Sequence, residues 1–146
     1  MWSQVLAAAI GTISFSLIFH VHKRFYPACG IIGGLGWLVY LISCKHLSIA
    51  ESSFLATCVV ALCSRTCAVY KRCPVTIFLI SGILPLVPGA GIYWTAYYLV
   101  TSQNALCMNS GILTIKTAFA IVLGIVFVFE LPQNFFRKLL FFQKNE

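Results

Sequence analysis

Five apolar stretches divide the chain, with polar and charged residues gathered between them. They cover residues 2–19, 29–44, 49–69, 75–100 and 112–131. A helix needs about 20 apolar residues to cross the hydrocarbon core of a bilayer. The pattern therefore predicts an all-α integral membrane protein with about five transmembrane helices in one transmembrane domain, residues 1–131. Because residues 29–44 form the shortest stretch and are rich in glycine, a four-span arrangement in which they do not cross stays open.

The composition agrees with a membrane protein and excludes a soluble domain. Of the 146 residues, 60% are hydrophobic and only 9% are charged. Soluble domains carry about 25% charged residues. No basic region precedes the first apolar stretch, and further spans follow it, so we interpret it as a retained helix rather than a signal peptide. The lipid bilayer is therefore an expected partner.

The basic residues gather in three clusters that decide the expected topology. These are Lys23 and Arg24, then Arg65, Lys71 and Arg72, and finally Arg137, Lys138 and Lys144. Lysine and arginine beside spans favour the cytoplasmic side. Five spans place all three clusters there, with the N-terminus outside and the C-terminus cytoplasmic, whereas four spans would split them. Scattered loop charges also account for the net charge of +7, so nucleic-acid binding is not expected.

Residues 132–146 are predicted to form a cytoplasmic amphipathic tail helix. Its apolar side would carry Phe135, Phe136, Leu139, Leu140 and Phe142, with basic residues opposite. Such helices lie in the membrane interface, with their basic groups facing anionic lipid. We interpret the tail as an anchor.

The reactive residue types show no pattern of catalysis or metal binding. The seven cysteines have no C-x-x-C spacing, and no disulfide between Cys44 and Cys107, the two nearest the expected outer face, is supported. The acids Glu51, Glu130 and Glu146 lie at span edges or in the tail, where no nucleophile, base and orienting group can be assigned. We therefore expect neither an enzyme nor a metal or cofactor.

Two local patterns predict how the helices begin and pack. Ser48 to Glu51, "SIAE", fits a capping box at the start of the third helix. Small residues recur four positions apart at Ala7 and Gly11, at Gly30 and Gly34, and at Ala120 and Gly124. Faces of this kind let helices approach closely in lipid. They predict a tightly packed bundle that also contacts a partner chain.

The fourth stretch contains residues that disfavour a continuous helix. Gly82, Pro85, Pro88, Gly89 and Gly91 lie within ten positions. Irregular backbone at membrane depth is tolerated where it is buried in protein or lines a wet cavity, and transporters use broken helices to bind substrate. A proline-kinked structural helix is the alternative interpretation. Tyr93 and Tyr97 follow the break and could contact substrate or equally form an interfacial aromatic belt. The predicted substrate-binding residues are Gly82, Pro85, Pro88, Gly89, Gly91, Tyr93 and Tyr97.

Two stretches carry a resemblance to a known family. "GGLGWLVYL", residues 33–41, and "CPVTIFLISGILPLVPGAGIYW", residues 73–94, resemble the short membrane subunit of the threonine/serine exporter family. The similarity extends over nearly the whole chain, and "GILPLVPG" is its most specific part. Ser81 departs from the family pattern, in which many members have proline.

This resemblance implies a secondary exporter of small amino acids or organic acids. Members resemble a ten-span protein that is either fused or split, and in the split form a short chain works with a larger membrane subunit. Five spans in each half imply inverted repeats. The alternative is a membrane scaffold subunit without its own substrate site, which only supports the partner's transport site.

Overall fold

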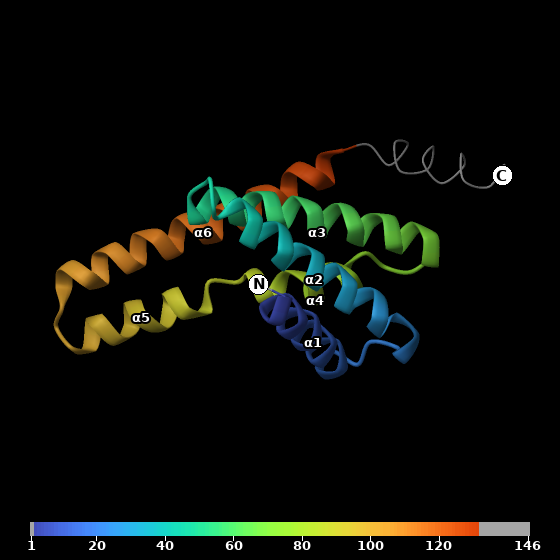
Figure 1. Ribbon diagram of the computed structural model, residues 1–146, viewed down its shortest axis with the longest axis horizontal. Helices are drawn as coiled ribbons and strands as arrows, with labels where there is room; N and C mark the ends of the chain where they lie inside the picture. The colour runs from blue at the N-terminus through green and yellow to red at the C-terminus, as the bar shows by residue number, and fades with distance from the viewer. Residues whose placement is uncertain (1, 132–146) are drawn as a thin grey trace.

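The structure, a computed structural model, describes residues 2–131, and these form helices without any strand (Figure 1). The elements are α1 (Trp2–Ile18), the 3₁₀ turn η1 (Lys23–Phe25), α2 (Tyr26–Ser43), α3 (Ile49–Lys71), α4 (Thr76–Ile83), the 3₁₀ turn η2 (Leu84–Leu86), α5 (Gly89–Val100) and α6 (Asn104–Glu130). The all-α prediction is confirmed for this part of the chain. The predicted amphipathic tail lies outside the described residues.

The helices form a bundle from which one hairpin projects. Helix α2 packs against α1, α3 and α4, and α6 lies along α3. Figure 1 shows α5 and the beginning of α6 extending together beyond one end of this bundle. Helix α5 packs mainly against α6, whereas α4 packs between α2 and α3. The first half of the fourth apolar stretch therefore lies inside the bundle, and its second half lies in the projecting hairpin.

Three helical segments are long and apolar enough to cross a membrane, namely Lys23–Ser43, Ile49–Lys71 and Asn104–Glu130. The pair Thr76–Leu86 and Gly89–Val100 passes the same criterion only when taken together, which gives up to four. Helix α1 is apolar but has only 17 residues. These long apolar helices agree with the predicted class, an integral membrane protein. The count of five spans stays a prediction.

Glycines set the distances between the helices of the bundle. A Cβ atom on Gly33 would overlap the Thr12 side chain of α1, and one on Gly36 would overlap Val60 of α3. Gly124 of α6 lies against Thr57 and the backbone of α3. Gly11 differs, since a Cβ atom there would meet nothing within 4 Å. The small residues on α2 and α6 are thus used inside the chain, whereas Gly11 leaves an open face on α1.

The capping box at the start of α3 is confirmed. The Ser48 N–H donates to Glu51 Oε2 at 2.9 Å, and the Glu51 N–H donates to Ser48 Oγ at 3.4 Å. These two bonds satisfy amides that have no partner within the helix. Glu51 therefore has a structural role.

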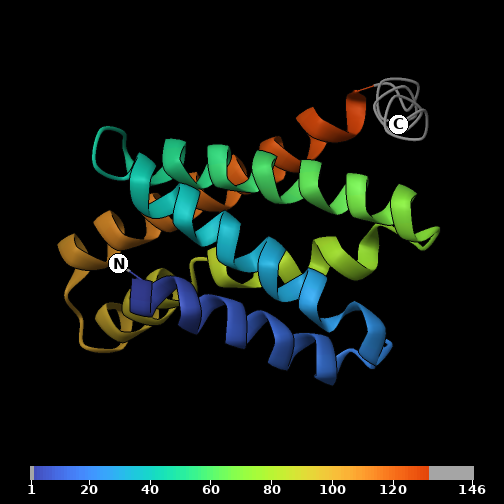
Figure 2. The same cartoon turned by 45° about the vertical axis from the view of Figure 1, so that its right-hand side comes forward.

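The connections are sorted between the two ends of the bundle. Figures 1 and 2 place the α1–α2 connection, the α3–α4 connection and the end of α6 at one end, and the α2–α3 and α5–α6 connections toward the other. The first group carries Lys23, Arg24, Lys71 and Arg72, whereas the second carries Lys45. This sorting matches the expected asymmetry of charge, and the orientation in the membrane stays a prediction.

Arg65, which was grouped with the basic residues between or near the third and fourth apolar stretches, does not reach the α3–α4 connection. It lies inside α3 with only 7% of its surface exposed. Its guanidinium donates to backbone carbonyls at the end of α6. Burial is tolerated because those carbonyls replace the water that the charge would otherwise bind.

Candidate functional site

The chain bends where glycine and proline are concentrated. Residues Thr76–Leu86 and Gly89–Val100 are inclined to each other by 47°. Val87, between η2 and α5, is extended with a ψ of 130°. Pro85 and Pro88 carry no N–H group, so neither can donate the backbone bond that a continuous helix requires. The interpretation of this bend as a discontinuous transmembrane helix stays a prediction.

The bend leaves backbone donors at the start of α5. The Gly89 N–H donates to the Val87 carbonyl at 2.7 Å, and the Ile92 N–H donates to the Pro88 carbonyl at 3.1 Å. No hydrogen bond joins the N–H of Ala90 or Gly91 to any described residue outside α5, and no side chain caps the helix. The first amides of a helix have no partner within it. These two donors are therefore open to an acceptor.

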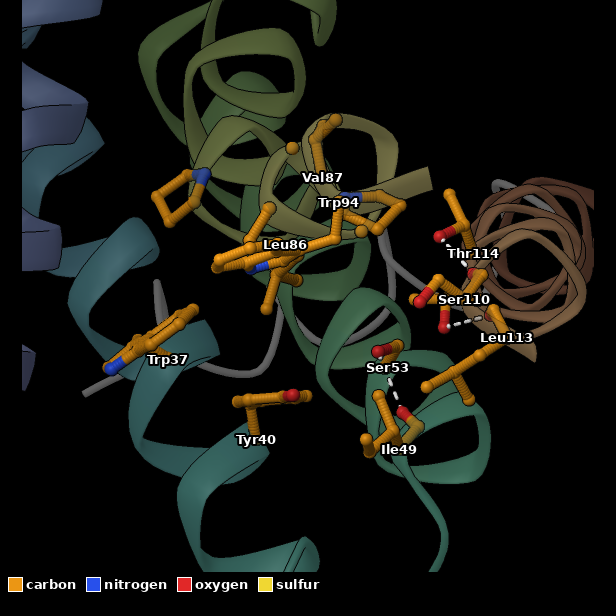
Figure 3. A pocket seen from close by; sticks show the side chains of 16 residues that line it. Trp37, Tyr40, Ile49, Ser53, Leu86, Val87, Trp94, Ser110, Leu113 and Thr114 are labelled. Atoms are coloured by element: carbon orange, nitrogen blue, oxygen red, sulfur yellow. Dashed lines mark hydrogen bonds between the residues drawn. The ribbon is translucent and has the colours of Figure 1, made fainter. Parts of the chain in front are cut away.

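A cavity of about 360 Å³ lies beside these amides (Figure 3). Such a volume falls in the range of small-molecule sites. It is lined by Trp37 and Tyr40 of α2, Ile49 and Ser53 of α3, residues 85–91 at the bend, Trp94 of α5, and Ser110, Leu113, Thr114 and Thr117 of α6. All of these lining residues belong to the described part of the chain, and none is charged.

The cavity has chemically different sides. In Figure 3, Trp37 and Tyr40 lie on one side, while Ser53, Ser110 and Thr114 lie on the other. The rings of Trp37 and Tyr40 are 5.1 Å apart between centroids. Aromatic surface and hydroxyl oxygens thus face each other across a space large enough for a small solute.

Three hydroxyl groups of the cavity lining are already committed as donors. Ser53 Oγ donates to the Ile49 carbonyl at 2.8 Å, and Thr114 Oγ1 donates to the Ser110 carbonyl at 2.7 Å. Thr117 Oγ1 donates to its own helix in the same way, at 2.9 Å. A hydroxyl that has given its proton to a carbonyl retains lone pairs for accepting. These hydroxyl groups therefore present acceptors, opposite in character to the amides of α5.

The structure brings together four of the seven predicted site residues. Pro85, Pro88, Gly89 and Gly91 line the cavity. A Cβ atom on Gly91 would overlap Thr114 of α6, so this glycine lets α5 approach α6 at the cavity. The bend therefore contributes both open amides and close packing to the same place.

The other three predicted site residues lie elsewhere. Gly82 is buried against Ile32 and Val60, where a Cβ atom would come within 3.0 Å of each side chain. Tyr93 and Tyr97 are 61% and 45% exposed and stack on each other with ring centroids 6.4 Å apart. None of the three lines the cavity. Their surroundings suit helix packing for Gly82 and an exposed aromatic surface for the tyrosines.

Sequence reasoning missed the lining residues contributed by α2, α3 and α6. A signal for α6 was present, because Ser110, Thr114 and Thr117 recur at intervals of four and three and so share one face of a helix. The predicted fifth segment began at residue 112, whereas α6 begins at Asn104. The shorter prediction left Ser110 outside the helix. Trp37 and Tyr40 lie in the "GGLGWLVYL" stretch that carries the family resemblance, but nothing in their spacing pointed to a site.

Fold and site together define a helical membrane protein with an uncharged, mostly apolar cavity that carries a few hydroxyl groups, beside a bend in the chain. The family described as "Threonine/Serine exporter, ThrE" matches residues 4–130, and the chain belongs to this family. The suspected resemblance is thereby confirmed. Family membership and the long apolar helices together identify it as a membrane protein.

A curated relative from Haemophilus influenzae, described as an uncharacterized protein, is 28% identical over 91 residues. The match covers 62% of this chain and 31% of the relative. The chain therefore matches less than a third of that longer protein. No solved structure matches the chain.

Proposed function

We propose that this chain is the membrane subunit of a secondary exporter of small amino acids or organic acids and that the cavity beside the bend binds the solute during export. The single observation that supports it most is the placement of open backbone donors, hydroxyl acceptors and aromatic surface around one uncharged cavity. A transported solute must bind and then leave, so a site without fixed charges suits this task. Membership in the exporter family supports the same function.

The start of α5 is the proposed position for a carboxylate. The N-terminal end of a helix carries a partial positive charge, equivalent to roughly half an elementary charge, and its amides point outward. Ala90 and Gly91 both line the cavity and both offer such amides. A carboxylate there would accept hydrogen bonds without requiring a lysine or arginine.

We further propose that the chain works with a larger membrane subunit. Helix α5 has no buried residue and packs mainly against α6, which leaves one side of the cavity region uncovered by this chain. The Trp37 Nε1–H is buried without an acceptor in the described chain, beside a hollow lined also by Gln4 and Ala7 of α1. A neighbouring subunit would supply both the missing cover and an acceptor. The length of the matched relative supports a larger transporting unit.

Filling the cavity separates this function from the scaffold alternative. Ser110→Phe places a large side chain in the lining, whereas the matched control Met108→Phe changes a residue that is 66% exposed on the same helix. Export of labelled L-threonine is measured in proteoliposomes containing the chain with its copurifying subunits. We expect Ser110→Phe to abolish export in assembled complexes and Met108→Phe to retain it. Unchanged export by Ser110→Phe would favour the scaffold alternative.

A further inference from the structure

The cavity contains a set of acceptors that the proposed carboxylate position does not use. Ser53 and Thr117 are 1% and 4% exposed, and both residues line the cavity together with Thr114. All three donate their protons to carbonyls of their own helices. A ligand that satisfies their remaining lone pairs must bring hydrogen-bond donors of its own. A carboxylate has none, so a second type of group is needed on this side.

The aromatic side of the cavity favours the same type of group. Trp37, Tyr40 and Trp94 all contribute to the lining. A cation within about 6 Å of an aromatic face is attracted by the negative potential of the ring, most strongly for tryptophan. A protonated amine supplies three donors for the hydroxyl oxygens and a positive charge for the rings. A protonated amine therefore suits both the hydroxyl oxygens and the aromatic rings of this cavity.

The absence of charge in the lining restricts the solute further. None of the lining residues is acidic, so an isolated ammonium entering the cavity would lose water without gaining a counter-ion. A carboxylate on the same solute, held by the Ala90 and Gly91 amides, would supply that counter-charge. A dicarboxylate would bring two negative charges and find no basic side chain in the lining.

From this arrangement we infer that Ser53, Thr114 and Thr117, with the rings of Trp37 and Tyr40, form a subsite for the protonated amine of a zwitterionic solute. This inference rests on the proposed function, because it assigns the second half of the same cavity. It makes the three hydroxyl groups specificity determinants that distinguish amino acids from the corresponding acids without an amine.

Three related probes test the subsite directly. L-threonine carries both charged groups, 3-hydroxybutyrate is the same molecule without the amine, and 1-amino-2-propanol is the same molecule without the carboxylate. Binding of each is measured by calorimetry on the protein purified in detergent with its copurifying subunits. We expect L-threonine to bind more tightly than either analogue, by about tenfold or more, because hydrogen bonds to charged groups are worth more than neutral ones.

Thr114→Val and Ser53→Ala remove the acceptors with little change in shape. Each should weaken L-threonine binding by about tenfold while leaving 3-hydroxybutyrate unchanged. Thr66→Val is the matched control, because Thr66 Oγ1 makes the same kind of bond, to the Leu62 carbonyl at 2.8 Å, on an exposed face. Two variants on different helices keep the test valid if one fails to fold.

The outcomes separate the inference from the proposed function. Equal binding of L-threonine and 3-hydroxybutyrate, or equal weakening of both by Thr114→Val and Ser53→Ala, overturns the amine subsite while leaving a carboxylate-binding cavity. An unmodified protein that binds none of the three probes contradicts the proposed site itself, and the amine subsite with it.

Discussion

The buried guanidinium of Arg65 in α3 donates to the carbonyl oxygen of Val128 in α6. The same Nη1 atom lies 3.0 Å from the Leu131 carbonyl oxygen, and the guanidinium carbon lies 5.5 Å from the centre of the Phe129 ring. The last carbonyls of a helix have no donor within it and carry a partial negative charge. The Val128 carbonyl also accepts from the Leu131 N–H at 3.3 Å, so Arg65 of α3 adds a second donor there and a complementary charge at the end of α6.

Replacing Arg65 should therefore loosen the end of α6. We expect Arg65→Met to lower the free energy of unfolding by about 2 kcal/mol, because carbonyls that bonded a charged donor lose it. Thermal unfolding in detergent measures the change, with Arg24→Met, at an exposed position, as the control. Equal melting temperatures for Arg65→Met and the unmodified protein would contradict this role.

The glycines of α1 and α2 should respond oppositely to the same substitution. Gly33→Ala puts a methyl group into the Thr12 side chain and should destabilise the bundle by about 1–3 kcal/mol. Gly11→Ala meets open space and should be neutral or gain up to about 1 kcal/mol, because alanine favours helix. Unfolding in detergent compares the two. If assembly with a partner is lost in Gly11→Ala, the open face of α1 is an interface.

The prolines at the bend should matter more for transport than for stability. Replacing Pro85 and Pro88 together by alanine restores two backbone donors and lets the helix continue, which would cover the α5 amides. We expect the double variant to assemble, with equal or greater stability, and to lose export. Pro27→Ala, in the first turn of α2, is the control. Export per assembled complex at the unmodified rate would mean that the prolines only shape the bundle.

A single amide of α5 can be removed without removing the bend. Proline is tolerated in the first turn of a helix, so Ala90→Pro deletes the N–H of a residue that lines the cavity while helix α5 is kept. Ala90→Ser retains the amide and serves as its control. We expect about a tenfold loss of L-threonine affinity for Ala90→Pro alone. Equal loss for both variants would point to side-chain crowding rather than to the amide.

The two ends of the bundle should lie on opposite sides of the membrane. Cys44 lies in the α2–α3 connection and Cys73 in the α3–α4 connection, and both are half-buried. In variants that retain one of these cysteines, an impermeant maleimide should label Cys44 in intact cells and Cys73 only after permeabilisation. Burial raises the pKa of the Cys73 thiol, so its labelling should continue to rise with pH above its usual titration range. The reverse pattern would invert the proposed orientation.

The sequence by itself determined the class of protein, the approximate helices and the position of the bend. These follow from local causes: apolar length sets membrane helices, proline and glycine set where regular backbone bonding fails, and Ser48 with Glu51 sets a helix start. Each cause acts within a few residues along the chain. The four residues Pro85, Pro88, Gly89 and Gly91 could therefore be placed at the candidate site from the sequence alone.

Only the tertiary structure decided which side chains face that bend. Tyr40, Ser53 and Thr114 come from three different helices, and their meeting depends on how closely those helices approach. That approach is set by contacts such as Gly91 against Thr114 and Gly36 against Val60. The hydrogen bonds from Arg65 to the carbonyls at the end of α6 likewise depend on how α3 packs against α6. Such contacts depend on packing between distant segments, which local periodicity does not encode.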